Sequence, residues 1–256
     1  MQRFQDKVIV ITGAGSGIGA ATAWRFADEG ANVVLVGRTA DKLEKLAATL
    51  PCQGQKVLIR PTDVADADQV KSLFDEVIDT FGRLDVLVNN AGTAVQGKLA
   101  EASDDDWRKV MSTNVDGVFY CCRAALPHLL ESKGNIVNTS SVSGLGGDWG
   151  MSIYNTSKGA ISNLTRALAL DHGGDGVRVN AVCPSLTRSE LTAGMFDNDE
   201  LMAKFAERMP MGRAAEPEEV ADVIAFLASD DARFVNGVNL PVDGGLSASN
   251  GQPRLG

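Results

Sequence analysis

The 256-residue sequence predicts one α/β domain, residues 1–256, with a doubly wound parallel sheet of seven strands and helices on both faces. Two observations support this Rossmann-type arrangement. Short β-branched runs alternate with helical patterns along the chain. The strand runs are apolar throughout, which indicates burial on both faces of the sheet. Strands and helices that alternate in this way form parallel sheets with right-handed crossovers.

The first half of the chain contains four of the expected strands, each a short apolar run followed by a helical pattern. The first strand reads KVIVIT and leads into glycines, and the second reads NVVLV. Both are rich in β-branched residues, which favour strands. The four strands are expected at 7–12, 32–36, 57–60 and 84–89, and the helices at 20–29, 41–50, 67–81 and 104–130.

The second half continues the alternation with one interruption. Strands are expected at 135–138, 178–182 and 239–242, and helices at 153–171 and 217–227. The stretch 184–211 breaks the pattern and is too long for an ordinary connection, so we expect it to be functional. Within it, we predict that residues 187–211 form a lid over the substrate.

Composition excludes several classes of protein. Acidic residues outnumber basic ones by 33 to 24, and the net charge of −9 argues against binding to nucleic acid or to an anionic membrane surface. No run reaches the ~18 apolar residues of a membrane span, and no signal peptide is recognisable. The four cysteines form no CxxC motif, which favours reduced thiols and a cytoplasmic location. The two histidines lack metal-ligand spacing, so no metal is expected.

A glycine-rich turn, TGAGSGIG at 12–19, follows the first expected strand and opens the first helix. Gly13, Gly17 and Gly19 allow a tight turn and a close approach to a ligand. A helix N-terminus also offers free amides to a pyrophosphate. Glycine-rich turns occur without ligands as well, but the end of a first strand is where open α/β sheets bind them.

Four further motifs follow this turn in order: Asp63-Val64, NNAG at 89–92, Asn114 within STNVDG, and Ser141 with YNTSK at 154–158. In this ordered set the chain resembles the short-chain dehydrogenase/reductase family, over nearly its whole length. The resemblance implies a nicotinamide-dependent oxidoreductase. A Y-x-x-x-K pair alone would be a weak signal, and its alternative reading is an exposed tyrosine and lysine on an ordinary helix.

The resemblance also implies the catalytic roles. Tyr154 would be the general acid/base, and Lys158, on the same helical face, would lower its pKa from about 10 and bind the nicotinamide ribose. Ser141 would bind the substrate oxygen, and Asn114 would hold a water in a proton relay. Ser140 and Ser143 are neighbours of Ser141, but the thirteen-residue spacing to Tyr154 selects Ser141.

The same resemblance places the cofactor in the loops that follow the strands. Asp63 would bind adenine, although it could instead cap the next helix. In PSLTRS, Ser189 takes the place of the family threonine and would bind the nicotinamide carboxamide. The expected cofactor-binding residues are Gly13, Ser16, Gly17, Ile18, Gly19, Arg38, Asp63, Val64, Asn89, Ala91, Gly92, Tyr154, Lys158, Pro184, Thr187 and Ser189.

The end of the second strand favours NADP over NAD. NAD enzymes of this type commonly carry a carboxylate there for the ribose hydroxyls. Here Gly37 takes that place and Arg38 follows, so a guanidinium could bind a 2′-phosphate that no carboxylate repels. Ser16 stands where many NADP-preferring relatives carry a basic residue, and NAD therefore remains the alternative.

A closer resemblance, to the bacterial meso-2,3-butanediol dehydrogenases (acetoin/diacetyl reductases), lies in SGLGGDWG, ALDHGGDGVRVNAVCPSL, GRAAEPEEVA and DGGLSASNGQP. It implies a small secondary alcohol or vicinal diol and the matching ketone as substrates. Asp148, Trp149 and Asn155 would line the substrate pocket with Ser141 and Tyr154. Other substrates of short-chain reductases stay open, such as a 3-oxoacyl thioester or a sugar alcohol. A non-catalytic nucleotide-binding regulator and an epimerase or dehydratase are the remaining alternatives.

The family resemblance further implies a homotetramer, with the helices at 104–130 and 153–171 and the last strand at its interfaces. The C-terminal tail, 247–256, extends beyond the final strand. We expect it to reach a neighbouring subunit's active site through Gln252, and the alternative is a disordered tail.

Overall fold

The computed structural model describes residues 2–52 and 54–252. Its centre is a seven-stranded sheet in the order β3-β2-β1-β4-β5-β6-β7, and every neighbouring pair is parallel. This confirms the fold class predicted from the sequence. The strands are β1 Val8–Thr12, β2 Asn32–Gly37, β3 Val57–Pro61, β4 Val86–Asn89, β5 Asn135–Thr139, β6 Arg178–Pro184 and β7 Asn239–Val242.

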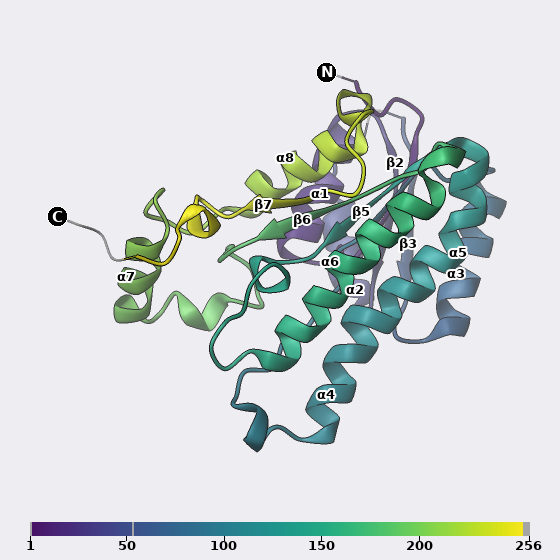
Figure 1. Ribbon diagram of the computed structural model, residues 1–256. Coiled ribbons are helices and arrows are strands. Elements are labelled where there is room, and N and C mark those ends of the chain that lie inside the picture. Colours follow the sequence, from purple (N-terminus) through teal and green to yellow (C-terminus); the bar gives the residue numbers. More distant parts are fainter. Residues whose placement is uncertain (1, 53, 253–256) are drawn as a thin grey trace.

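Eight α-helices lie in the described part of the chain and cover both faces of the sheet (Figure 1). Helices α1, α2 and α8 cover one face, and α3, α5 and α6 cover the other. The helices are α1 Gly17–Asp28, α2 Ala40–Ala47, α3 Ala67–Phe81, α4 Asp104–Met111, α5 Gly117–Ser132, α6 Ser152–His172, α7 Asp199–Arg208 and α8 Pro217–Ala228.

Burial on both faces explains the apolar strand runs. The residues of β1 alternate between two separate cores, since Ile9 and Ile11 pack under α1 and α8 while Val8 and Val10 pack under α3 and α5. All of β1 and all of β4 are buried. The central strands are therefore held rigidly, and only the loops at their carboxyl ends can reach a ligand.

Two expected elements differ from the structure. The long helix predicted at 104–130 consists of α4, a π-helical turn at Ser112–Asp116 and α5. The stretch 184–211, expected to be irregular, contains α7, which begins after Asn198 because the Asn198 side chain accepts a hydrogen bond from the Leu201 amide. This segment packs on a small cluster of its own, formed by Leu186, Met209 and Ala214.

Candidate active site

The strand order reverses between β1 and β4, because the chain moves from β1 outward to β3 and then returns to the other side. Open α/β sheets bind ligands outside the carboxyl ends of the strands at such a switch point. The loops that follow β1, β4, β5 and β6 carry most of the residues that the sequence motifs single out. The topology thus brings motifs far apart in the chain to one edge.

The glycine turn after β1 is built so that no side chain fits in it. A Cβ added to Gly19 would lie 2.1 Å from the carbonyl oxygen of Gly13, and one added to Gly13 would lie 2.8 Å from the Cα of Ala91. Gly13 and Gly17 have positive φ angles of 65° and 51°. Helix α1 begins here with no side-chain cap and no acidic residue in its first turn. This cradle fits a pyrophosphate, which would accept from the free amides.

Thr12 and Asn90 fix this turn against β4, and neither was singled out in the sequence. The Asn90 amide group donates to the carbonyl oxygens of Thr12 and Gly13 over 3.1 and 3.3 Å. The Thr12 hydroxyl accepts from the backbone amides of Asn90 and Ala91. The position of Asn90 within NNAG was the signal that could have found it. The Asn90 side chain therefore fixes the shape of the loop through its own hydrogen bonds.

Asn89, expected to line the adenosine side, turns its side chain into the interior. Its amide nitrogen donates to Asn138 Oδ1 over 2.9 Å and to Cys122 Sγ over 3.3 Å, and the residue is buried. Asn138 in turn donates to the Thr165 hydroxyl on α6. The Asn89 side chain therefore links β4, β5 and α6 and does not present its amide to the ligand edge.

Tyr154, Lys158, Ser141 and Asn114 converge beside Gly92. A Cβ added to Gly92 would lie 3.5 Å from Asn114 Oδ1 and 3.7 Å from Lys158 Nζ. Lys158 Nζ donates to the Thr139 carbonyl oxygen over 2.7 Å and lies 5.7 Å from the centre of the Tyr154 ring. Helix α6 thus carries the tyrosine and the lysine on one face, as their spacing predicts.

Asn114 lies in the π-helical turn and is buried. Its side-chain oxygen accepts from the Thr93 amide, and its nitrogen donates to the Thr93 carbonyl oxygen, each over 2.8 Å. The same nitrogen donates to the Ser157 hydroxyl over 3.0 Å. Single π-helical turns occur frequently at functional sites. The Asn114 side chain ties the loop after β4 to α6, next to the catalytic pair.

Burial dominates the ionisation of the pair. It lowers the pKa of Lys158 to about 8, so the ammonium form still prevails at neutral pH. Burial also raises the pKa of Tyr154, a hydrogen bond with Ser141 lowers it, and the charge of Asp148 raises it again. The protein's own groups therefore hold Tyr154 as a phenol, because burial, the largest cause, raises its pKa more than Ser141 lowers it.

The neighbours of Ser141 have other roles, which supports the spacing argument. The Ser140 hydroxyl donates to the Lys158 carbonyl oxygen over 3.0 Å and pairs with the Ser162 hydroxyl, so it joins β5 to α6. Ser143 donates its backbone amide to Ser141 Oγ over 3.1 Å. Of the three serines, Ser141 is the one whose side chain lowers the pKa of Tyr154.

The residues expected on the adenosine side of the cofactor lie at the ends of β2 and β3. Arg38 follows Gly37 and is exposed, and its guanidinium has no partner among the residues that the structure describes. Asp63 does not cap α3, because Asp66 does so by accepting from the amides of Asp68 and Gln69. Val64 is buried against Gly117. A free cation at this end fits the phosphate that NADP carries and NAD lacks.

The segment after β6 lies over the glycine turn. A Cβ added to Gly17 would lie 3.0 Å from the Cβ of Ser189. The Ser189 hydroxyl pairs with that of Thr192 over 3.0 Å, and Thr192 donates to the Thr187 carbonyl oxygen. Pro184 ends β6 and accepts from Ser141 over 3.4 Å. Thr192, which the sequence reasoning did not single out, fixes the two expected cofactor residues.

The three residues expected to line the substrate pocket differ in hydrogen bonding and in exposure. Asp148 accepts a short hydrogen bond from Ser143, and its backbone oxygen accepts from the Asn155 amide over 3.1 Å. The side-chain oxygen of Asn155 is buried without a partner among the described residues. Trp149 is 91% exposed, because it projects from a loop with glycines on either side. Its place in the wall of the substrate pocket stays a prediction.

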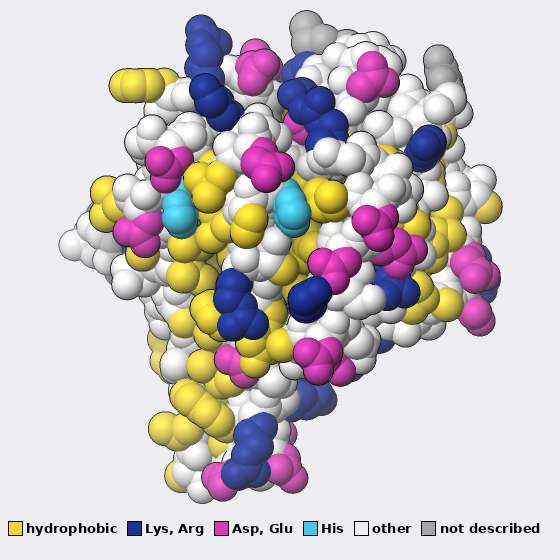
Figure 2. Space-filling model, turned by 90° about the vertical axis from the view of Figure 1, so that its right-hand side faces the viewer, with side chains coloured by type: hydrophobic (Ala, Val, Ile, Leu, Met, Phe, Trp, Pro, Cys, Tyr) yellow, Lys and Arg dark blue, Asp and Glu magenta, His cyan; other side chains and the backbone are white. Residues whose placement is uncertain are grey.

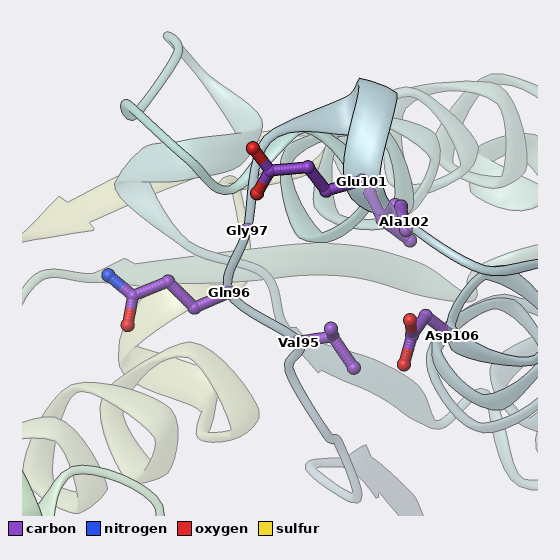
Figure 3. A pocket seen from close by; sticks show the side chains of 7 residues that line it. Val95, Gln96, Gly97, Glu101, Ala102 and Asp106 are labelled. Carbon is purple, nitrogen blue, oxygen red and sulfur yellow. The ribbon is translucent and has the colours of Figure 1, made fainter.

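A cavity of about 180 Å³ is lined by Ile153, which precedes Tyr154, and by none of the residues that the sequence predicted for the site (Figure 3). In this view Val95 and Asp106 point toward each other, and Gln96 points away. The Asp106 carboxylate accepts from Ser103 in the capping box of α4. The lining is Val95, Gln96, Gly97, Glu101, Ala102, Asp106 and Ile153. Through Ile153, which precedes Tyr154, the cavity adjoins the site.

Two further features bear on the class of protein. Across residues 2–52 and 54–252, no cluster of histidine, cysteine, aspartate and glutamate is arranged to hold a metal ion. Over the same ranges, no helix combines the length and the apolar character needed to cross a bilayer.

Comparisons with known proteins agree with this geometry. Residues 13–247 match a family model described as enoyl-(acyl carrier protein) reductase. The chain is 56% identical to meso-2,3-butanediol dehydrogenase from Serratia marcescens, with 99% of both chains covered. It is 41% identical to 2-(R)-hydroxypropyl-CoM dehydrogenase from Xanthobacter autotrophicus, over 95% of this chain and 99% of the other. The crystal structure of levodione reductase superposes with a TM-score of 0.92 at 36% identity, over 96% of this chain and 100% of that one.

Proposed function

The chain belongs to the short-chain dehydrogenase/reductase family, and from that membership we propose that it oxidises a small vicinal diol or secondary alcohol and reduces the matching ketone. It is an oxidoreductase that uses a nicotinamide cofactor. One observation carries the proposal: Tyr154 and Lys158 lie on one helical face, with Lys158 Nζ 5.7 Å from the centre of the Tyr154 ring. Binding alone would need no proton donor at this point.

In the proposed reaction, Tyr154 exchanges a proton with the substrate oxygen. Ser141 donates a hydrogen bond to the same oxygen and stabilises the charge that develops there. Lys158, with its pKa lowered to about 8 by burial, is protonated at neutral pH and favours the phenolate. The nicotinamide, when bound, accepts or supplies the hydride. Asn114 holds the loop after β4 against α6, which fixes the catalytic pair relative to the cofactor edge.

The substrate class rests on the relatives and on the polarity of the site. The Serratia marcescens relative is named for meso-2,3-butanediol, and 56% identity along the whole chain supports a similar diol here. Asp148 and Asn155 add polar groups near Tyr154 that suit a second hydroxyl. The test is a screen of cofactor turnover with the stereoisomers of 2,3-butanediol, with acetoin and with diacetyl. Absence of turnover with all of them would contradict this substrate class.

We propose NADP as the preferred cofactor. The unpaired guanidinium of Arg38 beside Gly37 supports a 2′-phosphate at the end of β2. Replacement of Arg38 by aspartate should shift preference from NADP toward NAD, measured as the ratio of kcat/KM for the two cofactors. The matched control is Arg108→Asp on α4, which should leave this ratio unchanged. Unaltered selectivity in Arg38→Asp would refute the assignment.

We also propose a homotetramer, which the exposed apolar side chains on α5 and α6 support. Figure 2 shows the face that carries both histidines, His128 and His172, with hydrophobic side chains gathered between charged ones. Phe119 on α5 is 46% exposed and Leu170 on α6 is 84% exposed. A helix face of this kind marks a protein interface. Sedimentation of the wild type and of Phe119→Glu tests it, and a monomeric wild type would contradict it.

The proposal also covers the C-terminal tail and the cellular compartment of the protein. Gln252 is exposed, and residues 253–256 of the tail lie outside the described residues. We propose that the tail reaches a neighbouring subunit's site; unchanged kinetics and assembly after deletion of 249–256 would refute this. All four cysteines are free, which supports a reducing compartment such as the cytoplasm.

A further inference from the structure

A chain of hydrogen bonds leads from Ser141 to a carboxylate at the edge of the site. The Ser141 hydroxyl lies 3.1 Å from Ser143 Oγ, and the Ser143 hydroxyl donates to Asp148 Oδ2. Both serines are buried, whereas Asp148 lies in the exposed loop after β5. Ser143 lies in the stretch SGLGGDWG, but the sequence motifs assigned it no role at the site. The chain therefore adds a charged group to the catalytic serine that those motifs do not predict.

The direction of the bonds follows from the number of protons. An ionised carboxylate can only accept, so Ser143 must give its single hydroxyl proton to Asp148. The Ser143 oxygen can then only accept, and the Ser141 proton is drawn toward it. The other acceptor for that proton within the protein is the Pro184 carbonyl oxygen at 3.4 Å. A lone pair of Ser141 accepts from the Ser143 amide, and the Ser141 side chain lowers the pKa of Tyr154.

The same carboxylate acts on Tyr154 through its charge. Burial is the larger cause that raises the pKa of Tyr154, and the negative charge of Asp148 raises it further. The ionisable groups around the phenol are Lys158 on its own helix, Asp148 in the loop, and Cys183 at the end of β6 next to Lys158. Burial raises the pKa of the Cys183 thiol to about 11, so it is neutral at physiological pH. Asp148 is therefore the anion that opposes Lys158.

We propose that Asp148 is a positioning residue for the reaction. Before substrate binds, Asp148 holds the Ser141 proton toward Ser143, and the substrate oxygen then replaces Ser143 as the acceptor of that proton. Asp148 also keeps Tyr154 in the form that carries a proton. That form protonates a ketone, so Asp148 favours reduction at neutral pH and delays alcohol oxidation to more alkaline pH. This inference rests on the proposed function. In it, the carboxylate of Asp148 sets the pH above which alcohol oxidation becomes faster than ketone reduction.

The first test compares Asp148→Asn with Ser143→Ala and with the control Asp79→Asn, which removes an exposed carboxylate on α3. The pH at which alcohol oxidation reaches half its maximal kcat/KM should fall by about one unit in Asp148→Asn. Ser143→Ala should lower it by less, because the charge of Asp148 remains. Asp79→Asn should not move it. Equal midpoints in the two aspartate variants, or a loss of rate without a shift in Asp148→Asn, would overturn the inference.

The second test needs no substrate. The chain has two tyrosines, Tyr120 and Tyr154, so Tyr120→Phe leaves Tyr154 as the single tyrosine. The near-ultraviolet absorbance of tyrosinate then reports the ionisation of Tyr154 alone. Adding Asp148→Asn should lower its midpoint by about one pH unit; an unchanged midpoint sinks the inference. If the wild type turned over no alcohol or ketone, the proposed function would fail while this titration still decided the role of Asp148.

Discussion

Gly19→Ala is expected to distort the glycine turn and to weaken the binding of the cofactor. The added Cβ would lie 2.1 Å from the Gly13 carbonyl oxygen and 2.6 Å from Asn90 Nδ2. Contacts of a real Cβ below 3.0 Å essentially do not occur, so the backbone must separate by about 0.9 Å. A shift of this size removes the hydrogen bonds by which Asn90 holds Thr12 and Gly13.

The cost can be estimated from these contacts. Overpacking costs about 1–3 kcal/mol, and the strained amide bonds of Asn90 add about 1 kcal/mol. Alanine recovers about 1 kcal/mol as the better helix former. We therefore expect the free energy of unfolding to fall by about 2 kcal/mol. The dissociation constant for NADP should rise at least about tenfold, because the amides of α1 leave their positions.

Denaturant unfolding and a fluorescence titration with NADP measure the two effects. The matched control is Gly174→Ala, where an added Cβ meets nothing within 4 Å. The control should change neither quantity by more than about 0.5 kcal/mol. If Gly19→Ala unfolded at the wild-type denaturant concentration and bound NADP within twofold of wild type, the steric argument would be wrong.

Three further changes test other parts of the structure. Tyr154→Phe should lower kcat by about 10²–10⁴-fold in a cofactor-turnover assay; retained turnover would exclude Tyr154 as the proton carrier. Lys158→Met should raise the unfolding free energy at pH 7 by about 1–3 kcal/mol while abolishing turnover, since burial lowers the pKa of Lys158 from 10.5 to about 8. The unfolded chain binds more protons between those values, so wild-type stability should rise with pH across that window, and unfolding curves of the variant should lack this rise. Glu29→Gln should lower the free energy of unfolding by about 2 kcal/mol at pH 7. Burial alone would raise the pKa of Glu29, but the hydrogen bonds from Arg3 and Arg25 outweigh burial and hold this pKa below 4.5. That stability is present above the unfolded pKa and disappears as pH falls through the folded value, so the two proteins should become equally stable in acid.

Local patterns in the sequence were sufficient for the fold and for the positions of the candidate residues Tyr154 and Lys158 on one helix. The strand at 57–61, the helix at 67–81 and the pair Tyr154 and Lys158 follow from apolar runs and spacing, since these are set within a few residues of chain. Their convergence follows from the topology of parallel sheets. These parts could be predicted because each rests on local periodicity or on a rule of connection.

The directions of individual side chains could not be predicted in this way. Asn89 and Asn90 are adjacent in NNAG, yet one bonds within the interior and the other clamps the glycine turn. Asn89 ends β4 and Asn90 follows it in the loop, so strand alternation does not assign Asn90 a side, and only the packed sheet shows which partners each one meets. The bond between Ser143 and Asp148 depends on a loop whose path contains several glycines and no periodic signal. Helix α7 was the one avoidable omission, since Asn198 is a recognisable cap.

The reversal of strand order between β1 and β4 affects the stability of the protein against unfolding and proteolysis in a cell. Groups at the ligand edge come from positions as far apart as Gly13 and Ser189, so no contiguous fragment carries enough of them to hold a dinucleotide. Cofactor then recognises only the intact chain, and at a hundred times its dissociation constant it adds about 2.7 kcal/mol to the cost of unfolding. Loss of the bound dinucleotide would lower the free energy of unfolding by that amount and make the enzyme more susceptible to proteolysis.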